Sequence, residues 1–230
     1  MCIRDSFSFG GVVLTNSWID FLIFGVAIAL VAVLYFTVFR KDDDGPRRKS
    51  KDLTGPARAA KPLAAARRLC ATEGYKLIAP ATLARSGAYA DLDFIVVGVF
   101  GVLCVKCLGL DGEVYGSAGD GKWLQVKAKG KQGEERISFE NPLAQAARDS
   151  RLVRDALFSA NLKSVPVETV CVFTNPHAQL ALPRDTGHYT VKTFRGLLDK
   201  DKLRQDKKVD MEKVAAALEA CRVPEARKMP

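Results

Sequence analysis

The chain has 230 residues, of which 48% are hydrophobic and 27% are charged, and its formal net charge is +9 at pH 7. This length allows one globular domain plus further segments, and the composition is ordinary for a folded protein. Most of the excess positive charge lies between Arg40 and Arg68, next to an apolar segment, and not in the remainder of the chain. Net charge alone is therefore weak evidence for nucleic-acid binding and better evidence for a membrane.

The apolar segment from Trp18 to Phe39 predicts a single transmembrane helix after an N-terminal tail (1–17). Its one charge is Asp20, at the outer end, and about 20 apolar residues span a hydrocarbon core of about 30 Å. A cleaved signal peptide is disfavoured because the preceding flank is not basic and no small-residue cleavage site follows. Basic residues come after the segment, so the positive-inside rule predicts a single-pass cell-membrane protein whose globular domain is cytoplasmic.

Residues 40–56 are polar, with two Gly-Pro pairs and a run of aspartates at 42–44, and they predict a flexible juxtamembrane linker. Two interpretations of its basic residues stay open. They can contact anionic head groups, at about 1 kcal/mol per residue, or they can act only as a topology signal.

The next residues predict a helix over 57–72 followed by a short edge strand over 75–79. The helix is rich in Ala and Arg, Pro62 suits a first-turn position, and Gly74 suits a helix end. No acidic residue lies between Leu53 and Thr72.

Two apolar runs, Phe94–Val97 and Val102–Val105, predict the hairpin around which the domain is organised. Glycines at 98 and 101 place the turn at the two residues between them. With this turn, Asp93 lies opposite Lys106 on the neighbouring strand. An acid and a lysine in such apolar strands are costly unless they are paired or used, which indicates a site.

The remaining chain alternates between strand and helix patterns. Asn141-Pro142 is a helix start, and the helix carries Gln145. Trp123 and Tyr115 are interpreted as packing residues, since few aromatics accompany them. The expected strands are 113–115, 123–126, 136–139, 167–173 and 189–192, and the expected helices are 141–161, a short one capped by Thr193, and 210–221, before a C-terminal tail (223–230).

These motifs resemble, in their order and spacing, the NERD (nuclease-related) domain of the restriction-endonuclease-like superfamily. The matching residues are Asp91-Leu-Asp93 with the following apolar run, Gly101-Val-Leu before the lysine strand, Gly112-Glu-Val-Tyr-Gly116, Trp123, and Asn141-Pro-Leu-Ala-Gln145. The resemblance covers about 57–200. It implies an α/β fold with a restriction-endonuclease-like mixed sheet flanked by helices, in a domain over 57–222.

The resemblance also implies a metal-dependent phosphodiesterase site. Asp93 would be a ligand for Mg²⁺ or Mn²⁺, Lys106 a phosphate-facing cation and Gln145 a contact near the site. Cys104 stands where the family has its catalytic Glu, and a soft sulfur is a poor ligand for a hard cation. The nearest substitute carboxylates are Asp91 and Glu113. Many family members also carry a metal-binding Glu in the first helix, which is missing here, and Cys107 replaces an expected Asn.

We therefore expect a membrane-anchored protein that binds or weakly processes DNA or RNA, with impaired or absent cleavage. The alternative is a catalytically inactive, membrane-tethered interaction or sensing module whose protein partner the sequence does not identify. Cys104-Val-Lys-Cys107 also spells a Cys-x-x-Cys, but residues i and i+3 of a strand point to opposite faces, which disfavours a redox pair or half a zinc site.

Overall fold

The computed structural model describes residues 51–129, 133–183 and 186–223. The predicted tail (1–17) and transmembrane helix (18–39) lie outside the described residues, as do the first part of the linker and residues 224–230. Within the described ranges, no helix combines the length and the apolar character that crossing a bilayer requires. The membrane anchor therefore stays a prediction from the sequence.

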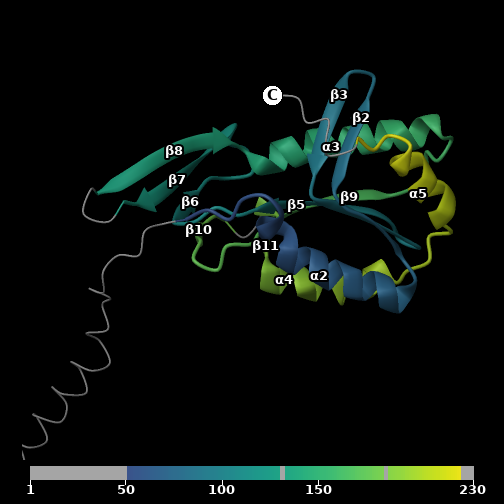
Figure 1. Ribbon diagram of the computed structural model, residues 1–230, viewed down its shortest axis with the longest axis horizontal. Coiled ribbons are helices and arrows are strands. Elements are labelled where there is room, and N and C mark those ends of the chain that lie inside the picture. The colour runs from purple at the N-terminus through teal and green to yellow at the C-terminus, as the bar shows by residue number, and fades with distance from the viewer. Residues whose placement is uncertain (1–50, 130–132, 184–185, 224–230) are drawn as a thin grey trace, which may run out of the picture. The chain divides into compact units, whose positions relative to one another are not determined.

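A mixed five-stranded sheet forms the centre of the domain (Figure 1). Its strands lie in the order β1-β4-β5-β9-β11; the pairs β1–β4 and β4–β5 are antiparallel, and the pairs β5–β9 and β9–β11 are parallel. The bounds are β1 (Lys76–Ile78), β4 (Phe94–Gly98), β5 (Gly101–Leu108), β9 (Val167–Phe173) and β11 (His188–Thr190). The mixed sheet predicted from the sequence is confirmed.

The hairpin of β4 and β5 has the predicted turn and register. Gly98 pairs with Gly101 across the two-residue turn, and Phe94 pairs with Val105. Gly101 has a φ of +124°, and a Cβ at this position would lie 2.3 Å from the carbonyl oxygen of Pro166. Glycine is required at this corner because any side chain would collide with the loop that leads into β9.

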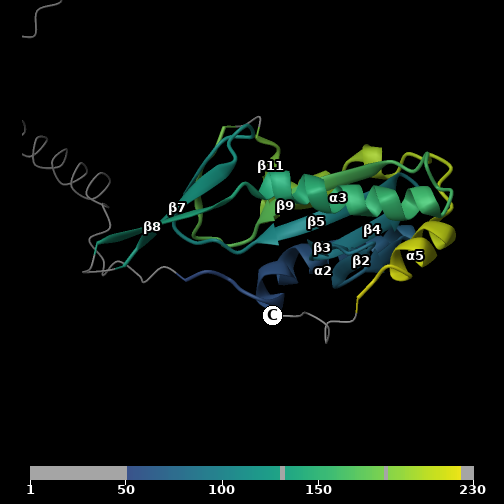
Figure 2. The same ribbon diagram turned by 90° about the horizontal axis from the view of Figure 1, so that it is seen from above.

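Helices cover both faces of the central sheet, with α2 and α4 on one face and α3 and α5 on the other (Figures 1 and 2). Their bounds are α2 (Pro56–Glu73), α3 (Pro142–Ser159), α4 (Val191–Leu198) and α5 (Met211–Glu219), and a 3₁₀ turn, η3 (Asp201–Leu203), follows α4. Alternate strand residues enter the two cores, because successive side chains of a strand point to opposite faces. Phe94, Val96, Leu103, Val105 and Cys107 pack toward α2 and α4, whereas Ile95, Val97, Val102 and Cys104 pack toward α3 and α5.

A second sheet of four strands has the order β10-β6-β7-β8. Its bounds are β6 (Glu113–Tyr115), β7 (Lys122–Ala128), β8 (Glu134–Glu140) and β10 (Gln179–Ala181). Trp123 is 1% exposed, stacks on Phe173 with ring centroids 6.3 Å apart, and donates its indole N–H to the carbonyl of Ser117 at 2.8 Å. Its predicted packing role is therefore confirmed.

A third, two-stranded hairpin of β2 (Ala81–Arg85) and β3 (Ala88–Leu92) packs against α3. This hairpin is not among the strands expected from the sequence. Four of its ten strand residues are alanine, and Thr82 and Tyr89 are its only β-branched and aromatic residues, so the pattern that marks a strand is weak. The hairpin is stabilised instead by the buried side chains of Leu83, Ala90 and Leu92, which join the core under α3 and α5.

The helix ends differ from the sequence analysis in two places. Pro56, not Pro62, occupies the first turn of α2, and Pro62 lies inside the helix. Thr190, not Thr193, is the N-cap of α4, and Thr193 completes a capping box with it. The end of α2 is as predicted, because Gly74 adopts a left-handed conformation with a φ of 71°.

Residues 51–53 fall in the predicted linker, yet they are hydrogen-bonded to the domain. The backbone N–H of Leu53 donates to the carbonyl of Gly109 at 2.7 Å. The Asp52 carboxylate accepts hydrogen bonds from the side chains of Gln125 and Lys127 of β7 and from the backbone N–H of Asp111. Residues 51–53 are thus fixed to β7 and to the segment between β5 and β6.

Candidate functional site

The predicted site residues lie where β3 passes into β4, beside the end of β5. Asp91 is the penultimate residue of β3, and Asp93 forms the bend between the two strands. The Asp93 N–H donates to the carbonyl of Val105 at 3.0 Å, which continues the hairpin register by one residue. Asp93 is therefore opposite Lys106 in backbone register, as the sequence predicts.

The Asp93 carboxylate is 8% exposed, and both of its oxygens accept hydrogen bonds. Arg58 of α2 donates Nε–H to Oδ1 at 2.9 Å, and the backbone N–H of Cys107 donates to Oδ2 at 2.6 Å. The same guanidinium reaches Asp91, with Nη2 3.9 Å from Oδ2. Burial lowers the pKa of Arg58, but the charges of Asp93 and Asp91 outweigh burial, so the pKa is raised and the cation is favoured.

Lys106 makes its contacts on the other face of the sheet. Its ammonium group donates to Asp149 Oδ2 of α3 at 3.1 Å and to the backbone carbonyl of Asp91 at 3.0 Å. The side chains of Lys106 and Asp149 are 6% and 9% exposed, so this ion pair is buried. The sequence analysis did not single out Asp149.

The expected pairing of the Asp93 and Lys106 side chains is wrong. Asp93 pairs with Arg58 from α2, and Lys106 pairs with Asp149 from α3, which pack on opposite faces of the sheet. The physical reason is the bend at Asp93, which interrupts the strand alternation and directs its carboxylate to the backbone of β5 and to α2. Each charge is neutralised by a helix residue instead of by the neighbouring strand.

Cys104 lies on the same face of β5 as Lys106 and is fully buried. Burial raises the pKa of its thiol to about 12, so the neutral form prevails at physiological pH. Cys107 is in the opposite core, beneath α2 and α4. The Cys-x-x-Cys spacing therefore does not bring the two thiols together, as expected for residues three apart on a strand.

The carboxylates as arranged do not fit an Mg²⁺ or Mn²⁺ ion. Both oxygens of Asp93 accept N–H hydrogen bonds, Asp91 contacts the same guanidinium, and Cys104 offers a buried thiol in place of an oxygen ligand. Glu113 belongs to the second sheet and accepts a hydrogen bond from the hydroxyl of Tyr115. Among the described residues, no three His, Cys, Asp or Glu side chains form a group that could hold a metal ion.

Gln145 lies on α3 in a cleft of about 520 Å³ between that helix and the β2–β3 hairpin. We call this the hairpin cleft. Tyr89, at its rim, is 72% exposed, the largest exposure among the large hydrophobic side chains of the described residues. The cleft is lined by Arg85, Ser86, Ala88, Tyr89, Gln145, Arg148, Asp149, Arg151, Leu152 and Asp155. It is therefore rich in arginine and reaches Asp149, the partner of Lys106.

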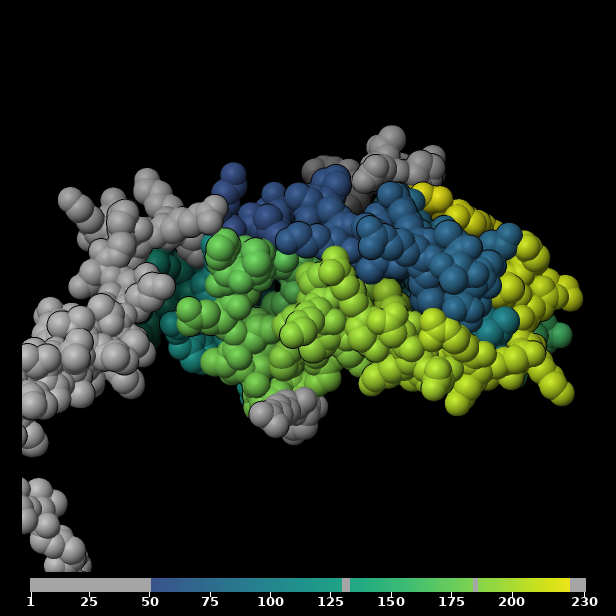
Figure 3. Space-filling model, turned by 90° about the horizontal axis from the view of Figure 1, so that it is seen from below, coloured from purple at the N-terminus to yellow at the C-terminus, as the bar shows by residue number. Residues whose placement is uncertain are grey.

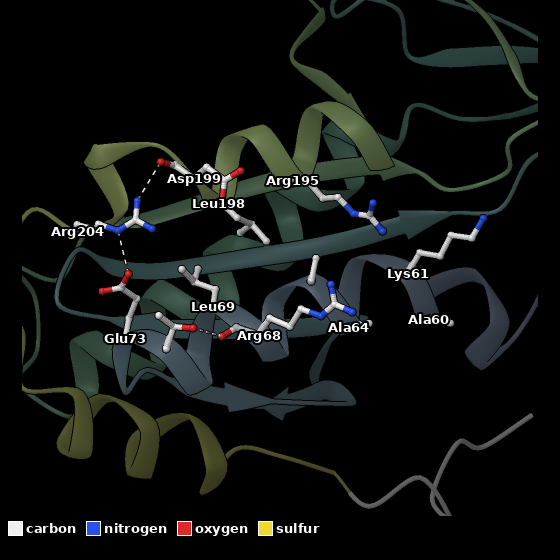
Figure 4. Close-up of a pocket in the computed structure, with 12 residues that line it drawn as sticks. Ala60, Lys61, Ala64, Arg68, Leu69, Glu73, Arg195, Leu198, Asp199 and Arg204 are labelled. Atoms are coloured by element: carbon white, nitrogen blue, oxygen red, sulfur yellow. Dashed lines mark hydrogen bonds and ion pairs between the residues drawn. The ribbon is translucent and has the colours of Figure 1, made fainter.

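A second basic groove of about 490 Å³ lies between α2 and α4, on the opposite face of the sheet (Figure 3). Figure 4 shows Lys61, Arg68 and Arg195 extending from the two helices over this groove. Arg204 is bonded there to Glu73, with Nε 2.9 Å from Oε1. None of the predicted site residues lines this groove, so it provides a natural comparison for the hairpin cleft.

The mixed sheet, the β4–β5 hairpin with an acid and a lysine beside it, and the helix that begins at Asn141-Pro142 define a mixed α/β domain with helices on both faces of its central sheet. The family model of the nuclease-related domain (NERD) matches residues 54–174, just over half of the chain. The chain belongs to the NERD family. No curated protein matches the chain.

Proposed function

We propose that this protein is a membrane-anchored member of the NERD family that binds DNA or RNA through the hairpin cleft, with impaired or absent metal-dependent phosphodiesterase activity. The anchor is the segment 18–39, and the domain faces the cytoplasm. Family membership supports a nuclease-related function. The composition of the hairpin cleft supports the nucleic-acid part of the proposal.

The observation that carries the proposal is that arginines and an exposed tyrosine line one cleft beside the Lys106–Asp149 pair. Arg85 extends from β2, while Arg148 and Arg151 extend from α3. Guanidinium groups bind phosphates through paired N–H donors, and an exposed aromatic ring can stack on a base. The hairpin and the helix together offer both kinds of contact to a strand of nucleic acid.

The charge of the cleft favours an anionic ligand. Asp149 is already neutralised by Lys106, which leaves Asp155 as the acid set against three arginines in the lining. Arg148 pairs with Glu140 at the surface, an exposed contact that a phosphate can replace at small cost. Gln145 adds neutral donors and acceptors on the same helix.

Cleavage is expected to be weak or absent because the site as arranged offers too few oxygen ligands to hold a metal ion. Asp93 would be the remaining metal ligand, Asp91 its nearest substitute partner, and Lys106 the cation of the site, but Arg58 and Asp149 already neutralise them. Mg²⁺ or Mn²⁺ would have to displace Arg58 to reach the carboxylates.

Binding is tested with the full chain in detergent or lipid nanodiscs and fluorescently labelled single- and double-stranded DNA and RNA. Replacing both Arg148 and Arg151 by Ala is expected to weaken binding about tenfold and to reduce its salt dependence. Tyr89→Ala removes a stacking contact of about 1–3 kcal/mol if single strands bind. The matched control is Arg68→Ala with Arg195→Ala, which removes equal charge from the other groove and leaves affinity nearly unchanged.

Three results would contradict this proposal. Absence of binding to any of the four nucleic acids favours the alternative of an inactive interaction or sensing module. Equal losses in the two double variants would show that net charge, and not the hairpin cleft, drives binding. Cleavage is assayed in parallel with Mg²⁺ or Mn²⁺, comparing the wild type with Asp93→Ala and Cys104→Glu, and activity that is strong in the wild type and lost in Asp93→Ala would refute the impaired site.

A further inference from the structure

We propose that Arg58 supplies, from within the chain, the positive charge that a divalent cation would bring to Asp91 and Asp93, so that this site is built to be independent of metal ions. The inference concerns the carboxylates and does not depend on nucleic-acid binding. Its basis is that the guanidinium of Arg58 contacts both acids.

The first step is electrostatic. Asp93 is nearly buried, and its neighbour Asp91 is half exposed, so two negative charges lie near each other where water screens them incompletely. Such a pair needs a cation or a proton. Arg58 provides the cation through a direct hydrogen bond to Asp93 and a longer ion pair to Asp91.

The second step is steric and geometric. The guanidinium of Arg58 donates a hydrogen bond to Oδ1 of Asp93, and the Cys107 N–H donates one to Oδ2. Both carboxylate oxygens therefore accept hydrogen bonds from N–H donors. A divalent cation at these oxygens would have to displace Arg58 and leave a half-buried guanidinium without its partners. The cost of separating an established ion pair opposes metal binding.

The third step is the absence of the other ligands that would favour a metal. Position 104 offers a buried thiol, and α2 carries Arg58 in a stretch that contains no acid from Leu53 to Thr72. The two features are consistent with each other, because a buried carboxylate with few oxygen ligands beside it gains stability from a fixed internal cation. Lys106 is similarly fixed by Asp149 on the opposite face.

The experiment measures Mn²⁺ binding by the full chain at pH 7, from the loss of the electron paramagnetic resonance signal of free Mn²⁺. Wild type and Asp93→Asn are expected to bind Mn²⁺ equally, so that Asp93 contributes no site. Arg58→Ala is expected to bind Mn²⁺ at least about tenfold more tightly than the wild type, because a positive charge that repels the metal ion has been removed from beside two carboxylates. Arg58→Glu adds a third carboxylate and is expected to bind more tightly still.

Three comparisons keep the result specific. Arg67→Ala removes an exposed arginine that lines the same cleft as Arg58, Asp91 and Asp93, and it should behave as the wild type. Asp93→Asn in the Arg58→Ala background should abolish the gained site, which separates it from binding by other acidic residues such as those at 42–44. Arg58→Lys keeps a positive charge at this position and should gain little Mn²⁺ binding.

A stability readout accompanies the binding measurement. Arg58→Ala is expected to melt below Arg67→Ala, and saturating Mn²⁺ should restore part of the loss in Arg58→Ala alone, since a ligand that binds the folded state stabilises it. The proposal is overturned if Asp93→Asn removes Mn²⁺ binding from the wild type, or if Arg58→Ala binds no more Mn²⁺ than Arg67→Ala. The comparison of the wild type with Asp93→Asn can therefore overturn the proposal even if Arg58→Ala does not fold.

Discussion

Lys106 of β5 and Asp149 of α3 form an ion pair across the core, with Nζ 3.1 Å from Oδ2 and both side chains less than 10% exposed. The ammonium group also donates to the backbone carbonyl of Asp91, so a single lysine joins the sheet, α3 and the end of β3. Both charges have been taken out of water, and each depends on the other for compensation. This pair, and not a contact with Asp93, fixes the position of Lys106.

Removing one partner of this pair should be strongly destabilising. Lys106→Met leaves the Asp149 carboxylate buried without a cation and is expected to cost about 3–5 kcal/mol of unfolding free energy. The double variant Lys106→Met with Asp149→Leu should recover most of that loss, because no charge remains buried. Chemical denaturation measures both, and Lys202→Met, which breaks an exposed pair with Glu168, should cost at most about 1 kcal/mol. Similar costs for Lys106→Met and Lys202→Met would contradict a buried, mutually dependent pair.

The sequence predicts the β4–β5 hairpin better than it predicts which residues pair with Asp93 and Lys106. Glycines on either side of a two-residue turn, in strands of β-branched and aromatic residues, are local signals, and they place Asp93 opposite Lys106 in register. The partners Arg58 and Asp149 are far away in sequence and sit on helices with several other charges. Local patterns do not reveal which charged residue of a helix meets which strand end.

The sequence nevertheless contains a pattern that marks Asp149 as a buried acid. Asp149 lies three residues after Ala146 and four before Val153, both of which are buried, so it interrupts the apolar stripe of α3. An acid on a buried stripe requires a cationic partner, and Lys106 is the buried lysine of the described residues. The β2–β3 hairpin had a weaker signal, since four of its ten strand residues are alanine and its strands pack mainly against α3.

Thiol reactivity should separate the described cysteines by burial. Burial raises the pKa of Cys104 to about 12, of Cys171 to about 12 and of Cys70 to about 11, so these remain neutral thiols at pH 8. Cys221 is partly exposed and is expected to react before the other four described cysteines with an alkylating reagent in the native protein. Peptide mass spectrometry after timed alkylation measures the order. Rapid labelling of Cys104 with Cys107, or recovery of a disulfide between them, would contradict this assignment and revive a thiol-redox function.

His188 should make stability fall in mildly acidic solution. It is partly buried beside the ring of Phe173, and burial lowers its pKa from the ordinary 6.5. Above pH 6.5 the imidazole is mostly neutral in both the folded and the unfolded protein. As the pH falls below 6.5 the unfolded chain takes up a proton first, so stability decreases until the lowered pKa of the folded state is reached. Denaturation between pH 8 and pH 5 should show a shallower loss of stability for His188→Asn than for the wild type, whereas equal slopes in the two proteins would exclude this cause.

Asp52 should attach the last residues of the linker to the domain in a pH-dependent way. Burial raises its pKa, but hydrogen bonds from Lys127, from the Asp111 N–H and from Gln125 outweigh that effect, so the pKa is lowered below 3.8. A lowered pKa means that the charged form is favoured in the folded state, so the stability is present above the ordinary pKa and is lost as the pH falls through the folded one.

Asp52→Asn in the full chain should therefore cost about 1 kcal/mol at neutral pH, and the difference from the wild type should narrow below about pH 4. Asp120→Asn, at an exposed turn where the carboxylate accepts a hydrogen bond from the Ser117 N–H, is the matched control for losing a carboxylate. Hydrogen exchange provides a second measurement, because the Leu53 amide, bonded to Gly109, should lose protection in Asp52→Asn alone. An unchanged Leu53 amide would show that residues 51–53 are held by their backbone contacts without the carboxylate.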